Sequence, residues 1–547
     1  MRASSSRYQP RHAKPARNSW GHAGDDNRSL PNHESAPTRF WRHHRTWIAT
    51  CLVALLGGFL RFFRLDEPHA VIFDETYYVK DAWTMLMTGE PRNWPESIAA
   101  PGGDLTPDQL FAQGDTNQWL PSAEYVVHPP VGKWFIALGL KLFGGASNPF
   151  AWRAAVAIAG TIAIVLLMRV TLRLFHNLSV AVLAGVLMSI DGVGITLSRT
   201  GLLDNFIMVL ALGAFALLLL HRDRSRRLLM RTSMLPSANA SASPKPPRLW
   251  FSRYRVGAAV LLGLATGVKW SGIYFLAAFC VLTVVWDALL VREFGYGRWF
   301  ANGFVQALLT ACYMVPIWFA TYVAGWTSWF MHSDSYMHNW AATHPGEGVT
   351  WLPEGLRSFV QYHAQMWRFH TTLDSWHPYK ANPLTWPLQI RPTSFYWEKL
   401  AGHPGLCALS PDSQCVAAVT SLGNPLIWWL ASLCVILGII IAIIKRGDWR
   451  IWAVLIGLIG GWLPWAQYIH RTTFTFYSVV ILPWMILAIC YVFNEIRRAA
   501  DRALWNTTLA CLIIVCSAVS VFFYPIWTAM PVPYHFWLSH MWLQSWI

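Results

Sequence analysis

Apolar runs of about twenty residues recur along this chain of 547 residues, and no other feature limits its possible folds as strongly. A helix of that length can cross a bilayer. Hydrophobic residues make up 54% of the chain and charged residues 13%, which is typical of membrane proteins. We expect spans at 47–63, 149–175, 178–197, 203–221, 254–270, 272–291, 300–324, 424–444, 450–466, 475–494 and 505–524. The sequence therefore predicts an all-α polytopic membrane protein with about eleven transmembrane helices.

Charges between the spans predict the orientation. Residues 1–46 carry nine Lys or Arg against three Asp or Glu, and residues 221–255 carry nine against one. Loop 64–130 instead carries three basic and eleven acidic residues. Basic residues near span ends favour the cytoplasmic side, so we expect a cytoplasmic N-terminus and an external C-terminus in the cell membrane. The net charge of +15 is thus a topology signal, and nucleic-acid binding is a poor explanation of it.

Four regions follow from this reading. Residues 1–46, rich in Ser, Pro, His and Arg, are expected to be a disordered cytoplasmic tail. An N-terminal transmembrane catalytic module is expected at 47–324, with its first external loop at 64–148. An external loop domain at 325–423 and C-terminal transmembrane helices at 424–547 complete the chain. Within the first loop, Pro130 to Leu142 is apolar but too short to span, which predicts a helix along the outer surface.

An acidic pair, Asp74 and Glu75, stands shortly after the first span in the segment 71–78 (VIFDETYY). Two adjacent carboxylates beside aromatic residues at a membrane surface are costly to hold unless water or chemistry uses them. A solvated loop turn would explain the pair equally well if it stood alone. The pair is therefore a candidate catalytic site that the rest of the chain must support.

The cysteines indicate one structural feature. Seven of the nine lie in apolar spans, where a cysteine is usually a small core residue. Cys407 and Cys415 stand apart in the external loop, and on an oxidising face they favour a disulfide over two free thiols. No CxxC, HExxH or clustered His and carboxylate spacing occurs, so we expect no metal site and no other cofactor, and the sequence leaves a dependence on divalent metal open.

Several motifs together resemble one enzyme family, the protein O-mannosyltransferases of the GT-C superfamily. The likeness runs in order from about residue 60 to the C-terminus, and its middle and late motifs separate this family from related lipid-phosphate-sugar transferases. Fungal and animal members insert a β-trefoil domain in the long external loop, for which 325–423 is too short. The chain is therefore similar to the actinobacterial type. The motifs are 73–78 (FDETYY), 128–133 (HPPVGK), 198–205 (SRTGLLDN), 267–272 (GVKWSG), 376–379 (WHPY), 386–387 (WP), 391–392 (RP), 424–425 (NP) and 471–477 (RTTFTFY).

The resemblance implies transfer of mannose from polyprenyl-phosphate-mannose to Ser or Thr hydroxyls of exported proteins, at the outer face, by an inverting single displacement. A hydroxyl is a weak nucleophile and needs a positioned base. We expect Asp74 to be this base and Glu75 to orient either the acceptor or Asp74, and the reverse assignment of the two carboxylates stays open. Contacts with the acceptor are expected from Tyr77, Tyr78, His128, His377 and Trp386.

The departing polyprenyl phosphate gains negative charge, which fixed cations can stabilise. Each candidate cation could instead reach toward lipid headgroups, and that alternative stays open for all of them. The candidates for contact with the donor phosphate are Lys133, Arg153, Arg199, Lys269, Arg391 and Arg471.

Two other functions remain as alternatives. One is a related glycosyltransferase that decorates a cell-wall glycan or lipid from the same kind of donor. The other is a transporter, which the sequence disfavours because mid-span charges are few and internal repeats are not evident. The expected partners are the lipid donor, Ser- and Thr-containing exported proteins, membrane lipids and, as a candidate, the protein-export channel.

Overall fold

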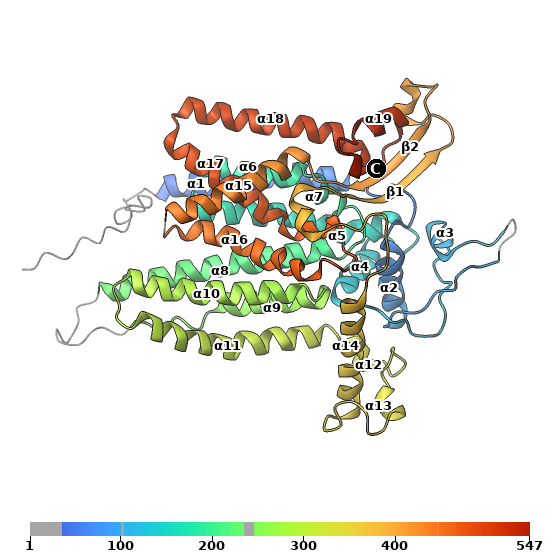
Figure 1. Cartoon of the computed structure of the whole chain (residues 1–547), viewed down its shortest axis with the longest axis horizontal. Helices are drawn as coiled ribbons and strands as arrows, with labels where there is room; N and C mark the ends of the chain where they lie inside the picture. The colour runs from blue at the N-terminus through green and yellow to red at the C-terminus, as the bar shows by residue number, and fades with distance from the viewer. Residues whose placement is uncertain (1–35, 100–102, 235–245, 446) are drawn as a thin grey trace, which may run out of the picture.

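A computed structural model describes residues 36–99, 103–234, 246–445 and 447–547. Long helices lie side by side in a bundle, and short helices, loops and a small sheet gather at one end of it (Figure 1). The predicted disordered tail lies outside the described residues up to residue 35. Helix α1 (Ala36–Phe62) begins at Ala36, so the prediction of disorder is wrong for residues 36–46.

Nine stretches among the described residues are long and apolar enough to cross a membrane, and each matches a predicted span. The other two predicted spans contain shorter helices, α6 (Leu178–Ile190) and α9 (Arg253–Val268). The protein is thus a mostly helical, multi-pass membrane protein as predicted, whereas the count of eleven spans stays a prediction. The long elements after α1 are α5 (Pro149–Phe175), α8 (Asp204–Ser233), α10 (Gly272–Glu293), α11 (Trp299–Ala324), α15 (Pro425–Ile444), α16 (Trp449–Gly461) with η3 (Leu463–Tyr468), η4 (Thr475–Ile481) with α17 (Leu482–Ala499), and α18 (Arg502–Trp527).

The predicted span 178–197 is broken into α6 and the short helix α7 (Gly192–Thr196). Asp191 causes the break, because its carboxylate accepts a hydrogen bond from the Gly194 N–H at 3.0 Å and so caps α7. On the other side of the break, Arg61 donates to the carbonyls of Met188 at 2.9 Å and Ser189 at 3.3 Å. These bonds satisfy backbone groups that an interrupted helix would otherwise leave unpaired in an apolar surrounding.

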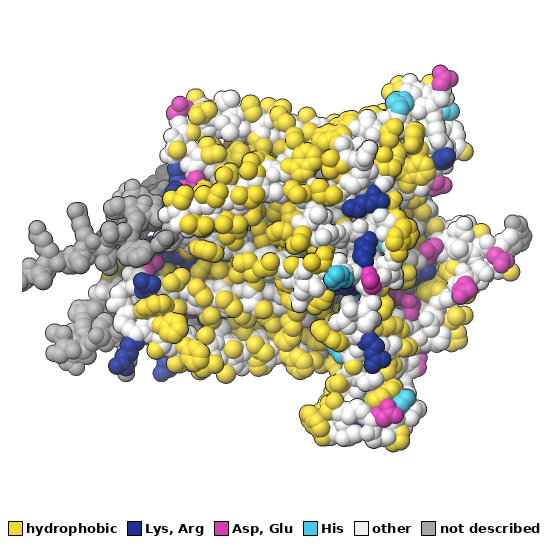
Figure 2. Space-filling view, in the orientation of Figure 1, with side chains coloured by type: hydrophobic (Ala, Val, Ile, Leu, Met, Phe, Trp, Pro, Cys, Tyr) yellow, Lys and Arg dark blue, Asp and Glu magenta, His cyan; other side chains and the backbone are white. Residues whose placement is uncertain are grey.

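The core lies between the central helices. Among the membrane-crossing candidates, the span that includes α17 is the most buried, with 94% of its most apolar stretch inside the protein. The corresponding share for α11 is 17%. The exposed side chains of α11 include Phe300, Phe304 and Leu308, which a bilayer would cover. Hydrophobic side chains dominate the middle of the bundle, and charged side chains lie mainly toward its two ends (Figure 2). This belt agrees with a membrane crossing.

One end of the bundle carries the remaining elements. The predicted surface helix is α4 (Val131–Leu142), which packs against α2 (Glu75–Thr88) and α5. Helix α14 (Glu354–Thr372) runs across the direction of the long helices (Figure 1). The other short elements are α3 (Pro107–Ala112), α12 (Thr327–Met331), α13 (Trp340–Thr343), η1 (Pro383–Leu388), η2 (Gly405–Leu409), α19 (Tyr534–Ser539) and η5 (Gln544–Trp546).

A small antiparallel sheet, which the all-α prediction did not include, stands at this end. Its order is β1 (Thr393–Leu400), β2 (Cys415–Ser421) and β3 (Val532–Pro533). The strands pair Leu400 with Cys415, and a disulfide of 1.98 Å joins Cys407 to Cys415. The pairing of β2 with β3 ties the loop before α15 to the segment after α18, and the disulfide closes a turn within that loop.

We expect the end that carries α2, α4 and the sheet to face outside the cell, because the opposite end carries the basic segments. A reporter that is active only in the cytoplasm should work when fused after Ser233, at the end of α8. A reporter that is active only after export should work when fused after Ile547. Activity of the same type of reporter at both positions would contradict the odd number of spans that we predict between Ser233 and Ile547.

Candidate active site

Asp74 lies where the first loop enters helix α2. The α2 backbone begins at this residue, because the N–H groups of Tyr77 and Tyr78 both donate to the Asp74 carbonyl at 3.1 Å. The preceding residue, Phe73, has a positive φ of 49° and stacks on Phe395 of β1 at a ring distance of 4.8 Å. The aromatic contact and the helix start together fix the direction of the Asp74 side chain.

The carboxylate of Asp74 lies in a mostly buried polar cluster. It accepts a hydrogen bond of 3.4 Å from the Tyr78 hydroxyl. Burial raises the pKa of Asp74 to about 6, while the positive charge of Lys269 opposes this rise and the negative charge of Asp204 adds to it. A carboxylate whose pKa is close to neutral can accept a proton from a hydroxyl more readily than one of ordinary pKa.

Glu75, the other member of the acidic pair, is a structural residue. Its side chain is fully buried, and its two oxygens accept from the Arg153 guanidinium at 2.8 and 2.9 Å. They also accept from the N–H groups of Gly201 at 2.8 Å and Ile72 at 3.1 Å. Because all these partners occupy its oxygens, the alternative in which Glu75 orients the acceptor is wrong, whereas the alternative in which it orients Asp74 agrees with its place at the start of α2.

Arg153 was predicted to contact the donor phosphate, and this prediction is also wrong. The side chain is 0% exposed. Besides the Glu75 carboxylate, its guanidinium donates to backbone carbonyls, so it has no donor left for a ligand. These carbonyls belong to Leu65, Pro68 and Ala70.

Arg199 and Lys133 are excluded as phosphate ligands by their partners. Arg199 donates to the carbonyls of Arg61 at 2.8 Å and Phe63 at 2.6 Å, so it caps the end of α1. Lys133 forms an ion pair of 3.2 Å with Asp81, and its side chain is 1% exposed. Both cations lie at the end of the bundle where we expected them. The sequence did not show that Lys133 neutralises Asp81 or that Arg199 caps α1.

Arg391 has a third structural role. Its guanidinium donates to the carbonyls of Ser545 and Ile547 at 2.6 Å each, and to the carbonyl of Pro378. It thus joins the start of β1 to the C-terminal segment, and the prediction of a phosphate contact is wrong. The last two predicted cations behave differently, because both line a cavity.

The cavity, of about 280 Å³, lies beside α14 and the loops that join α9 to α10 and η3 to η4. Lys269 lines it and forms an ion pair of 2.7 Å with Asp204. Arg471 lines it from the other side and, among the described residues, has no carboxylate partner in the cavity wall. Its Nε atom is buried without a hydrogen-bond partner in the described structure. The cavity therefore presents two cations, one of them uncompensated, as an anionic ligand requires.

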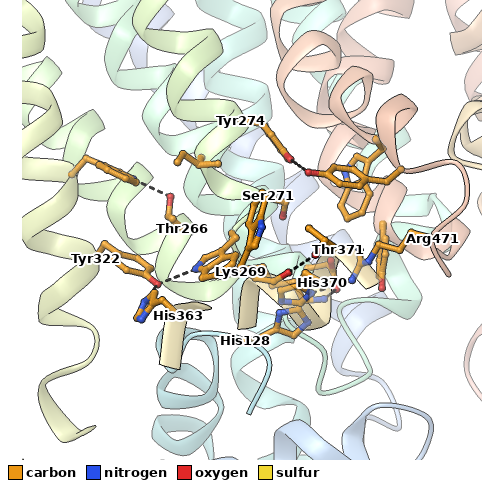
Figure 3. Close-up of a pocket in the computed structure, with 18 of the residues that line it drawn as sticks. His128, Thr266, Lys269, Ser271, Tyr274, Tyr322, His363, His370, Thr371 and Arg471 are labelled. Atoms are coloured by element: carbon orange, nitrogen blue, oxygen red, sulfur yellow. Dashed lines mark hydrogen bonds and ion pairs between the residues drawn. The ribbon is translucent and has the colours of Figure 1, made fainter. Parts of the chain in front are cut away.

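Three histidines share this cavity. Figure 3 shows His128 and His370 close together, with Arg471 on one side and Tyr322 and His363 on the other. The rings of His128 and His370 stack at 5.1 Å. Burial, reinforced by the positive charges nearby, lowers the pKa of His128 well below its usual value, and it lowers the pKa values of His363 and His370 to about 4. All three imidazoles are therefore neutral near pH 7.

The predicted acceptor residues divide into two groups. Tyr77 is 58% exposed and His377 is partly exposed beside Phe73, so contact with an acceptor stays a prediction for both. Tyr78 is buried and bonded to Asp74, and His128 lines the cavity, so contact with an acceptor stays a prediction for these two as well. Trp386 is fully buried, and the prediction that it contacts the acceptor is wrong. Its ring instead supports Trp465 and Tyr477 of the cavity wall, at 5.4 and 5.8 Å.

Some residues of the site were missed by sequence reasoning. Asp204 and Tyr477 lie within motifs already noted, so their motif membership could have nominated them. His370 and His363 lie on α14, outside these motifs, and only the folded arrangement brings them to the cavity. In the part of the chain that the structure describes, no group of three His, Cys, Asp or Glu residues could hold a metal ion.

Known proteins of one family are similar to this chain. Residues 127–236 match the family described as dolichyl-phosphate-mannose-protein mannosyltransferase, and residues 355–546 match the C-terminal four TMM region of protein-O-mannosyltransferase. A polyprenol-phosphate-mannose–protein mannosyltransferase of Mycolicibacterium smegmatis (strain MKD8) is 32% identical over 91% of this chain and 93% of its own length. A relative of the same name from Mycobacterium tuberculosis (strain CDC 1551 / Oshkosh) is 32% identical over 92% of each chain.

The fold also has a solved counterpart. The Saccharomyces cerevisiae protein O-mannosyltransferase Pmt1-Pmt2 complex, bound to the sugar donor, matches with a TM-score of 0.67 and 13% identity. The match covers 92% of this chain and 93% of that chain. The shared arrangement shows that this chain has the fold of that protein O-mannosyltransferase.

Replacement of Glu75 by Gln should destabilise the protein, because it leaves the Arg153 charge buried without its counter-ion. Breaking such a pair typically costs about 3–5 kcal/mol. Thermal unfolding in detergent should occur at a clearly lower temperature than for the wild type. Glu96→Gln, at an exposed glutamate of the same loop, is the matched control. A Glu75→Gln protein that unfolds at the wild-type temperature would refute the structural role.

Proposed function

This chain belongs to the protein O-mannosyltransferase family, and on that premise we propose that Asp74 deprotonates the acceptor hydroxyl while the neighbouring cavity holds the donor phosphate. The protein is a polyprenyl-phosphate-mannose–protein mannosyltransferase. One observation carries the mechanism. A carboxylate with a raised pKa stands next to a cavity that is lined by an uncompensated cation and a second, paired cation.

The apolar end of the cavity supports a lipid-linked donor. Its wall includes Ile273, Phe319 and Trp367, whose side chains remain 40%, 55% and 57% exposed. Ile273 and Phe319 belong to α10 and α11, both membrane-crossing candidates, so this side of the cavity borders the expected bilayer. A polyprenyl chain could therefore stay among lipids while its phosphate reaches the polar end.

The polar end supports stabilisation of the leaving phosphate. In the proposed step the acceptor oxygen bonds to C1 of mannose, and the bond from C1 to the phosphate oxygen breaks. The hydroxyl proton passes to Asp74, and the bonding electron pair leaves with polyprenyl phosphate. Arg471 and Lys269 stabilise the added negative charge, since charge-assisted hydrogen bonds are strong where water is excluded. A single displacement of this kind inverts the configuration at C1.

In this proposal the acceptor reaches Asp74 from the solvent. The exposure of Tyr77 and the place of the partly exposed His377 beside Phe73 support a contact of both residues with a polypeptide. We propose that this end faces outward and that the acceptors are Ser or Thr residues of exported proteins. The N-terminal module 47–324 would then supply Asp74 and Lys269, and the loop domain 325–423 would supply α14. The protein-export channel is the candidate partner that delivers such acceptors before they fold.

Replacement of Asp74 by Asn tests the proposed base directly. Asn keeps the size of the side chain but cannot accept the proton, so transfer of mannose to a Ser- or Thr-containing peptide should fall about 10²–10⁴-fold. The measurement is incorporation of labelled mannose from polyprenyl-phosphate-mannose in detergent. Binding of the donor and the temperature of unfolding should stay close to wild type.

Asp115→Asn, an exposed aspartate of the same loop, is the matched control and should transfer mannose normally. Wild-type turnover in the Asp74→Asn protein would remove Asp74 from the catalytic role.

A further inference from the structure

We propose that His370 is a positioning residue that holds the Arg471 guanidinium in place for the donor phosphate. The inference rests on the proposed function, since it assumes that Arg471 binds this phosphate. Three observations carry it: the two hydrogen bonds of the His370 ring, the packing that fixes this ring, and the absence of a carboxylate partner for Arg471 among the described residues.

The two ring nitrogens of His370 have different partners, and these partners select one tautomer. Nε2 lies 2.7 Å from the Val127 carbonyl oxygen, which can only accept, so Nε2 carries the proton. Nδ1 then has a free lone pair, and it lies 3.2 Å from Nη2 of Arg471, which can only donate. The backbone carbonyl thus determines that the ring presents an acceptor to the guanidinium.

The position of the His370 ring is fixed by its surroundings. It stacks on His128 at 5.1 Å and meets the Trp270 ring at 5.7 Å. Helix α14 is itself tied to the spans by a hydrogen-bond chain, in which the Trp270 indole donates to the Tyr322 hydroxyl at 2.9 Å. The Tyr322 hydroxyl in turn lies 2.7 Å from Nε2 of His363, which is a residue of α14, and this nitrogen accepts the hydrogen bond. The acceptor for Arg471 therefore stands on a rigid support.

The remaining contacts of Arg471 show what this support achieves. Its guanidinium lies over the Trp465 ring at 5.7 Å, and its Nε atom is buried without a partner in the described structure. A long side chain loses rotamer freedom when it binds a ligand, and this loss weakens binding. Because His370 and Trp465 hold the guanidinium before the donor arrives, part of this cost is met in the free enzyme.

The charge of His370 agrees with this role. The charged and titratable groups that face it are His128, Lys269 and Arg471, and Asp204 pairs with Lys269. Burial and the Arg471 charge lower the pKa of His370 to about 4, so the ring stays neutral and keeps its acceptor over the ordinary range of pH. A protonated ring would instead repel Arg471.

The test compares two replacements of His370 that differ in one property. Asn places an oxygen near the position of Nδ1 and can still accept from Arg471, whereas Leu has a similar volume and no acceptor. The affinity for a short-chain prenyl phosphate is measured by calorimetry on the full-length protein in detergent. His370→Leu should weaken binding about tenfold, and His370→Asn should stay within about threefold of wild type. His403→Asn, at an exposed histidine, is the control for the substitution itself.

The same measurement in an Arg471→Ala background separates the possible failures. There His370→Leu should have no further effect on binding, because its partner is gone. Any of three results would overturn the positioning role. The first is an equal loss of affinity from His370→Leu with and without Arg471, and the second is unchanged binding in His370→Leu. The third is an equal loss of affinity in the Asn and Leu proteins. If Arg471→Ala alone leaves the affinity unchanged, the proposed phosphate site fails as well. If His370→Leu does not fold, a more than tenfold loss in the Asn protein still overturns the role.

Discussion

The buried ion pair between Glu75 and Arg153 is the interaction on which the site depends. It joins the start of α2 to α5, and through the Gly201 N–H it also joins the segment before α8. Removing two charges from water is expensive, and such a pair is tolerated only when further hydrogen bonds satisfy both partners. Here two backbone N–H groups and three backbone carbonyls do so. One carboxylate of the acidic pair thus fixes the backbone from which the other, Asp74, projects.

Around Asp74, charges of opposite sign alternate across a short distance. The charge of Lys269 acts on the pKa of Asp74, and Lys269 pairs directly with Asp204. Arg471 faces the same cavity and has no carboxylate partner among the described residues. Electrostatic interactions are stronger in such a poorly hydrated place than in bulk water. The arrangement gives one base of raised pKa and one available cation, which are the two groups that displacement of a phosphate by a hydroxyl requires.

The sequence predicted much of this fold because hydrophobicity and length determine where a chain crosses a membrane. The nine membrane-crossing candidates among the described residues follow directly from their apolar runs. The break between α6 and α7 was not predictable in this way, since it depends on the local cap by Asp191 and on Arg61 reaching carbonyls far along the chain. The same reason explains the errors among the cations. Lys133, Arg199 and Arg391 occupy motifs as Arg471 does, and Arg153 lies near the start of a predicted span. The partners of these four residues come from other segments and appear only in the folded protein.

The central claim is that the environment of Asp74 makes it the proton acceptor, and the pH dependence of kcat/KM for the donor tests it most directly. This quantity reports groups of the free enzyme. Because the base must be ionised, mannose transfer should fall as the pH drops through about 6, the pKa of Asp74. Asp204→Asn removes the negative charge that raises this pKa, so its acid limb should move to lower pH. A limb that is absent in the wild type, or that does not move in Asp204→Asn, would contradict the account.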